Sequence, residues 1–160
     1  MFIRPLEDWV GWGIVLVVAL SCGVLLASCQ EAHAEVIIDM EAIKQIESGG
    51  NVKAYNVTSE AVGWFQITPI CLLDFNVENK QHYRTLDLFS PQVNSRVATW
   101  YMDERIPELL KARGIADSVE NRLIGFNCGV GCVGKPLPSE TANYLRKYKS
   151  LARENAATGL

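Results

Sequence analysis

A glutamate at the end of an apolar helix pattern is the residue of this chain best suited to acid chemistry. The apolar residues before Glu47 recur at helical spacing: Ile38, Ala42, Ile43 and Ile46. Gly49 and Gly50 can adopt the left-handed turn that ends a helix, so Glu47 is predicted in the last turn, beside unpaired carbonyl groups. Because a carboxylate is disfavoured there, its pKa should rise if the site is also shielded from water. An acid that stays protonated near neutral pH is what general acid catalysis of glycosidic cleavage requires.

Five helices are predicted to position this residue. They begin near residues 38, 69, 91, 118 and 138. Thr68-Pro69 and Ser90-Pro91 each combine a capping residue with a proline at the first helical position, and the helix from Thr68 is expected to end at Phe75. Pro107 should kink or split the longest helix. Only a short stretch around residues 64–67 suggests a strand, so the sequence predicts a mainly α fold with the site in a cleft between helices.

The first 34 residues carry signals for export. No charged residue occurs between Asp8 and Glu31, and this apolar span suits a signal peptide or a single membrane-spanning helix. Leu26-Ala27-Ser28-Cys29 resembles a bacterial lipobox, which would make Cys29 a lipidated N-terminus, whereas Ala32-His33-Ala34 is an A-x-A cleavage site. Cleavage at either place or a retained anchor are the three outcomes that the sequence leaves open. Each predicts a protein of the periplasm or cell envelope, held at the membrane if the segment is retained or Cys29 is lipidated.

Residues 35–150 are predicted to form one domain and residues 151–160 a flexible tail. Of the 15 basic and 18 acidic residues, one basic and three acidic residues lie within residues 1–34, which leaves the remainder at a formal charge of −1. A nearly neutral domain lacks the positive surface that binds nucleic acid, and it suits a largely uncharged polymer such as a glycan. The sequence predicts no cofactor.

The domain contains an odd number of cysteines: Cys71, Cys128 and Cys132. In an exported protein, Cys128 and Cys132 could close a small disulfide loop, or either could pair with Cys71, and one thiol would stay free. A zinc site is not predicted, because His82 is the only histidine of the domain and there is no second cysteine pair.

Five motifs, in order along the chain, resemble those of the soluble lytic transglycosylases. Residues 47–50 and 63–69 are similar to the family's E-S-G and G-L-M-Q-I-x-P signatures. Ser90-Pro91 with Asn94 and Tyr101 resembles its D-P-x-x-N…Y helix. Residues 125–129 stand where the family has A-Y-N-A-G, and residues 138–144 resemble its P-x-E-T-x-x-Y segment. The resemblance extends from about residue 37 to residue 149.

The resemblance implies a lysozyme-like helical domain that cleaves the MurNAc–GlcNAc bond of peptidoglycan and leaves a 1,6-anhydro-MurNAc end without using water. It implies that Glu47 is the catalytic residue. Substrate contacts are expected for a further set of residues: Ser48, Trp64, Gln66, Tyr101, Phe126, Asn127 and Glu140. A helix-end cap for Ser48, core burial for Trp64 and a first-turn helix charge for Glu140 stay open as alternatives. Tyr144 is expected to pack in the core.

The chain departs from the family pattern near the expected catalytic centre. Phe126 stands where the motif has tyrosine, so the hydroxyl expected near the catalytic glutamate is missing, and Tyr101 or Tyr55 could supply it. Trp64-Phe65 replaces Leu-Met and widens the aromatic surface near the cleft.

The residue chemistry points to one acid. Between Glu47 and Asp74 the only other carboxylate is Glu60, in a polar loop where a solvated charge is expected. A two-carboxylate hydrolase needs a second acid across the scissile bond, whereas a single acid fits a substrate-assisted route. Glu47 would protonate the glycosidic oxygen, the N-acetyl group would support the oxocarbenium-like centre, and Glu47 would then take the proton of the 6-hydroxyl.

Three functions are compatible with this pattern. The first is an exported lytic transglycosylase that opens the wall locally, with a secretion, conjugation or phage machine as a partner. The second is a muramidase that hydrolyses the same bond, for which Glu60 or another acid would have to matter. The third is a catalytically weak glycan-binding or assembly protein, and Phe126 is its best support.

Overall fold

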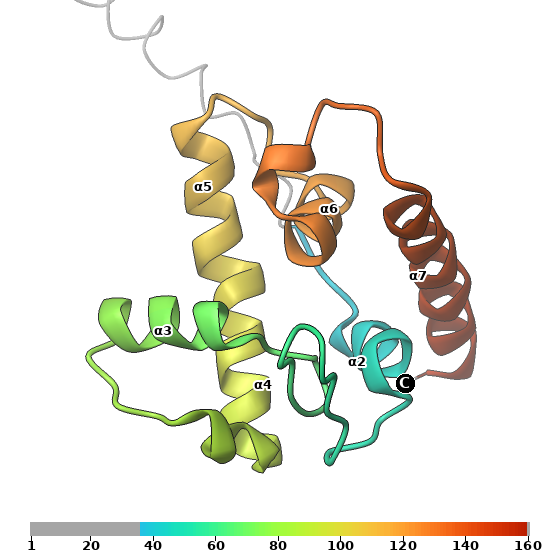
Figure 1. Ribbon diagram of the computed structural model, residues 1–160. Coiled ribbons are helices and arrows are strands. Elements are labelled where there is room, and N and C mark those ends of the chain that lie inside the picture. The colour runs from blue at the N-terminus through green and yellow to red at the C-terminus, as the bar shows by residue number, and fades with distance from the viewer. Residues whose placement is uncertain (1–35, 160) are drawn as a thin grey trace, which may run out of the picture. The chain divides into compact units, whose positions relative to one another are not determined.

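The computed structural model describes residues 36–159, which form helices joined by loops (Figure 1). The first of these helices, α2 (Met40–Ser48), is capped by Asp39, whose side chain accepts a hydrogen bond from the backbone N–H of Ala42. It ends at Gly49, which has a φ of 63°. The predicted helix and its glycine stop are therefore confirmed. The export segment and the Cys29 lipidation site lie outside the described residues.

A long helical rod forms one part of the domain. Helix α4 (Pro91–Trp100) continues through a π-helical turn (Tyr101–Arg105) into α5 (Ile106–Ala112), and Figure 1 shows α4 and α5 end to end. Pro107, at which the sequence predicts a kink or a split, lies in the first turn of α5, directly after the π-helical turn that divides the rod into α4 and α5. Proline lacks an N–H and its ring crowds the preceding turn, and the wider π turn relieves that conflict.

The remaining helices complete the domain: α3 (Pro69–Glu78), α6 (Val119–Cys128) and α7 (Ser139–Thr158), with short 3-10 turns at Thr85–Phe89 and Val130–Cys132. Helix α7 contacts both α2 and α6, and α6 contacts α5 (Figure 1). Helix α3 runs three residues beyond the predicted end at Phe75, because the backbone N–H and the side-chain amide of Asn79 both donate to the Phe75 carbonyl.

The expected tail is helical. Helix α7 continues to Thr158, although the sequence predicts a flexible segment from residue 151. Asn155 Nδ2 donates to Asp39 Oδ2 at 2.8 Å, and the backbone N–H of Asp39 donates to Tyr148 Oη at 2.8 Å. Leu151 also packs against the core. The end of α7 is helical because it contacts the start of α2, which is distant in sequence.

One buried asparagine holds the loop between α2 and α3. Asn94 Oδ1 accepts from the backbone N–H of Phe65 at 2.9 Å, and Asn94 Nδ2 donates to the carbonyls of Val62 at 2.8 Å and Leu88 at 3.0 Å. Gly63 has a φ of 77°, and a Cβ there would lie 2.4 Å from Asn94 Nδ2. The short strand expected near residues 64–67 is absent from the described residues, where only isolated bridges occur.

The apolar core lies where the helices converge. Its fully buried members include Ile43 on α2, Phe75 on α3, Val97 on α4 and Leu123 on α6. None of the helices in residues 36–159 combines the length and the apolar character that crossing a membrane requires.

Candidate active site

Glu47 lines a polar cleft of about 740 Å³ that is bordered by α2, α6, α7 and the loop held by Asn94. The structure brings five of the predicted site residues into this cleft: Glu47, Gln66, Phe126, Asn127 and Glu140. They come from four separate segments of the chain, so the cleft exists only once α6 and α7 have packed against α2. Further polar side chains on its wall are those of Asn56, Ser59, Asn143 and Lys147.

The environment of Glu47 favours its protonated form. Burial raises the pKa of Glu47 from its ordinary value of 4.5 to about 7. The hydroxyl of Tyr144 opposes this rise in pKa, and the negative charge of Glu140 adds to it. A carboxyl group with this pKa is about half protonated near neutral pH, so it can both donate and accept a proton there.

Tyr144, which the sequence predicts to pack in the core, is also a functional candidate. Its ring is buried, and its hydroxyl is the one buried polar side-chain atom in residues 36–159 without a hydrogen bond of normal geometry. Burial and then the neighbouring Glu47 carboxyl raise the pKa of Tyr144. The hydroxyl therefore lies near the Glu47 carboxyl group, and both residues line the cleft. The available sequence signal was its position four residues after Glu140, which places both on one face of α7.

Tyr144 is the tyrosine that lines the cleft together with Glu47. Phe126 contributes only an apolar edge to the cleft, and Tyr55 and Tyr101 are not among the residues that line it. Tyr144 is thus the tyrosine that stands beside the carboxyl group of Glu47.

Gln66 has an unusual backbone conformation at the cleft. Its φ of 47° lies in the left-handed region, which non-glycine residues rarely adopt. Its Nε2 donates to the carbonyl of Gly63 at 3.0 Å, which leaves the side-chain oxygen as the acceptor that can face a ligand. Strain of this kind is often found at binding sites.

Ser48 and Trp64 lie outside the cleft lining. Ser48 Oγ donates to the carbonyl of Trp64 at 2.9 Å and so links the end of α2 to the following loop. The ammonium group of Lys44 lies over the indole ring of Trp64, 4.8 Å from the ring centroid, in a cation–π contact. This geometry gives both residues structural contacts, and the substrate contacts expected of them stay predictions.

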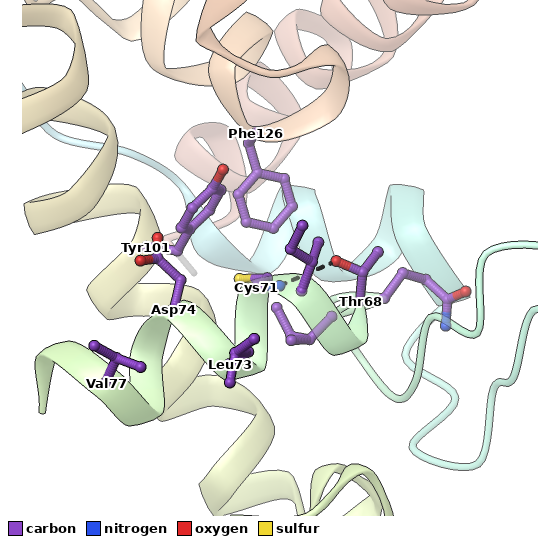
Figure 2. A pocket seen from close by; sticks show the side chains of 10 residues that line it. Thr68, Cys71, Leu73, Asp74, Val77, Tyr101 and Phe126 are labelled. Carbon is purple, nitrogen blue, oxygen red and sulfur yellow. Dashed lines mark hydrogen bonds between the residues drawn. The ribbon is translucent and has the colours of Figure 1, made fainter. Parts of the chain in front are cut away.

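Tyr101 lies in a second, mostly apolar groove of about 580 Å³ (Figure 2). This groove shares Gln66, Thr68 and Phe126 with the polar cleft, so the two cavities adjoin. The ring centroids of Tyr101 and Phe126 are 6.1 Å apart, and Figure 2 shows the two rings side by side at the α3 groove. Phe126 therefore stands at the junction of the cavities.

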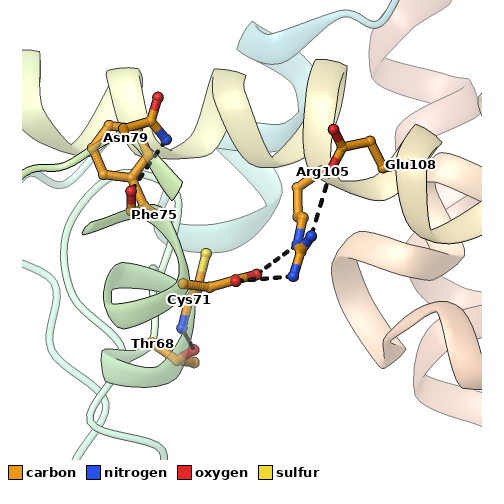
Figure 3. Close-up of polar contacts among 7 residues, drawn as sticks. Thr68, Cys71, Phe75, Asn79, Arg105 and Glu108 are labelled. Atoms are coloured by element: carbon orange, nitrogen blue, oxygen red, sulfur yellow. Dashed lines mark hydrogen bonds and ion pairs between the residues drawn. The ribbon is translucent and has the colours of Figure 1, made fainter. Parts of the chain in front are cut away.

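A forked ion pair fixes the α3 wall of this groove. Arg105 Nε lies 2.8 Å from Asp74 Oδ2, and Arg105 Nη2 lies 3.0 Å from Asp74 Oδ1. Arg105 also contacts Glu108 at 3.4 Å (Figure 3). Because Arg105 belongs to the π-helical turn, the pair ties α3 to the long rod.

The cysteines form one of the pairings left open by the sequence. Cys128 and Cys132 are joined by a disulfide with a Cα–Cα distance of 6.1 Å, directly after Phe126 and Asn127 in the chain. Among residues 36–159, Cys71 is the free thiol, and its burial raises its pKa to about 12, which makes it a poor nucleophile. Within residues 36–159, no group of three or more His, Cys, Asp and Glu side chains is arranged to hold a metal ion.

Comparison with known proteins identifies the family. Residues 28–149 match the family model for the transglycosylase SLT domain. No curated protein and no solved structure gives a significant match. The family match covers the cleft and every predicted site residue, and it indicates a transglycosylase-type activity on peptidoglycan and binding of its glycan strands. The chain belongs to the transglycosylase SLT domain family.

Proposed function

We propose that this protein is an exported lytic transglycosylase that cleaves the MurNAc–GlcNAc β-1,4 bond of peptidoglycan and forms 1,6-anhydro-MurNAc. The observation that carries the proposal is Glu47, a carboxyl group in a polar cleft whose burial raises its pKa to about 7. A general acid that must then act as a base works best when its pKa is near the working pH.

The cleft residues suggest a two-step reaction. Glu47 donates its proton to the glycosidic oxygen as the bond to the anomeric carbon breaks, and the N-acetyl oxygen of MurNAc supports the positive charge that develops there. The Glu47 carboxylate then takes the proton of the 6-hydroxyl while that oxygen bonds to the anomeric carbon. Between these steps, the otherwise unpaired hydroxyl of Tyr144 donates to the Glu47 carboxylate.

A muramidase activity is the second candidate function, and the position of Glu140 in the cleft favours it. Glu140 lines the same cleft, and its charge contributes to the raised pKa of Glu47, so the two carboxyl groups are neighbours. A hydrolase could use Glu140 as the second carboxylate. Glu60, the acid considered from the sequence, is exposed in a loop and is not among the residues lining the cleft.

Mass spectrometry of the products separates the candidates. Purified peptidoglycan would be digested with the wild-type protein, Glu47→Gln and Glu140→Gln. A transglycosylase releases anhydro-muropeptides, loses this activity in Glu47→Gln and keeps it in Glu140→Gln. Reducing-end products that disappear with Glu140→Gln would establish a hydrolase instead. A folded wild-type protein that binds glycan strands but releases nothing would be a binding or assembly protein.

Export is part of the proposal and rests on the apolar N-terminal segment and its two processing signals. Replacing Cys29 by serine distinguishes the routes. Loss of acylation and of membrane association would identify a lipoprotein. An unchanged mature protein that begins at Glu35 would identify cleavage after Ala34. A secretion, conjugation or phage machine is the partner expected for local opening, and cross-linking in the envelope would test this expectation.

A further inference from the structure

Thr141 is a buried polar residue next to the cleft. It follows Glu140 in the first turn of α7, and only 2% of its surface is exposed. Its hydroxyl donates to Asn127 Oδ1 at 2.8 Å, which connects α7 to the last turn of α6. A buried hydroxyl needs a hydrogen-bond partner, and in the described residues Asn127 supplies it for Thr141.

This contact decides which end of the Asn127 side chain faces the cleft. Asn127 lines the cleft and is half-buried. Its oxygen is engaged by Thr141, on the side of α7. The oxygen and nitrogen of a primary amide point in different directions, and Asn127 Nδ2 has no acceptor among the described residues. The nitrogen is therefore the end that is free to donate into the cleft.

We infer that Thr141 is a positioning residue: its hydroxyl orients the Asn127 amide so that Nδ2 donates a hydrogen bond to an acceptor oxygen of the bound sugar. The inference rests on the proposed function, because it assumes that a glycan occupies the cleft. Thr141 does not itself line the cleft, so it acts only through Asn127. A donor held in one orientation binds better than one that must be ordered on binding.

A double-mutant cycle tests the coupling. Thr141→Val preserves shape and removes the hydroxyl, whereas Thr141→Ser keeps it. Loss of one positioned hydrogen bond should lower kcat/KM for purified glycan strands about three- to ten-fold in Thr141→Val, with Thr141→Ser close to wild type. In the Asn127→Ala background, Thr141→Val should have no further effect, because the group that it orients is already gone.

The outcomes separate this inference from the proposed function. Equal effects of Thr141→Val with and without Asn127 would show a purely structural role and overturn the inference, as would no effect in the wild-type background. If the wild-type protein cleaves nothing, the proposed function fails, and NMR then tests the inference alone. On titration with an N-acetylglucosamine tetramer, the side-chain amide signal of Asn127 should shift in the wild type and not in Thr141→Val. The same shift in both proteins, or none in the wild type, would refute the inference.

Discussion

Replacing the proposed catalytic acid should stabilise the folded protein at neutral pH. In Glu47→Gln, an uncharged amide takes the place of a carboxyl group that is buried in the cleft. The pKa of Glu47 rises from 4.5 to about 7 on folding, so ionisation is harder in the folded protein than in the unfolded chain. Ionisation of Glu47 therefore destabilises the fold at any pH above the unfolded pKa, and Glu47→Gln removes this penalty.

The size of this effect follows from the difference between the two pKa values. A rise of about 2.5 pH units, at 1.36 kcal/mol per unit, corresponds to about 3 kcal/mol. Below about pH 4 the carboxyl group is protonated in both the folded and the unfolded state. The difference in the free energy of unfolding between the wild type and Glu47→Gln should therefore not change with pH there. As the pH rises from 4.5 to about 7, the free energy of unfolding of the wild type should fall by about 3 kcal/mol relative to that of the variant. Above that pH the difference should stay constant.

Urea denaturation of purified protein with its disulfide intact, followed by tryptophan fluorescence at a series of pH values, measures this difference. Glu60→Gln is the matched control, because Glu60 is exposed and is not among the residues lining the cleft. Its stability should follow the wild type at every pH. Parallel pH profiles for the wild type and Glu47→Gln would contradict this prediction, since they would mean that Glu47 titrates alike in the folded and unfolded protein.

Two further predictions concern residues that support the site. Asn94→Ala should lower the free energy of unfolding by about 3 kcal/mol, because it leaves the N–H of Phe65 and the carbonyl of Leu88 buried without a partner. The Val62 carbonyl loses one of its two hydrogen bonds and keeps that from the N–H of Ile67. Urea denaturation would measure the loss, and a loss below about 1 kcal/mol would contradict this role. Tyr144→Phe should raise the pKa of Glu47 further, because it removes the hydroxyl that favours the carboxylate, so the pH profile of kcat should move to higher pH. An unchanged profile would show that the hydroxyl does not act on Glu47.

Local signals in the sequence were enough to predict where most helices begin. Thr68 and Ser118 cap α3 and α6 with their side chains, and Gly49 ends α2 in the left-handed conformation. These contacts join residues that are neighbours in the chain, so composition and spacing reveal them. The end of α7 was missed because it depends on the contact between Asn155 and Asp39, which are 116 residues apart.

At the site, too, features set by neighbouring residues could be predicted, and features set by residues distant in the chain could not. Glu47 was identifiable because its helix and its glycine stop are local features. The position of the Tyr144 hydroxyl beside Glu47 requires α7 to pack on α2, which no local pattern specifies. Ser48 adjoins Glu47 in sequence, but successive residues on a helix point in different directions, and Ser48 bonds to the Trp64 carbonyl.

In the proposed reaction, Glu47 alone transfers the protons of a cleavage that uses no water. Digestion of purified peptidoglycan in water enriched in the heavy oxygen isotope, followed by mass spectrometry, tests it most directly. We expect anhydro-muropeptides without heavy oxygen from the wild type and from Glu140→Gln, and no products from Glu47→Gln. Heavy oxygen at the new reducing ends, or undiminished cleavage by Glu47→Gln, would contradict it.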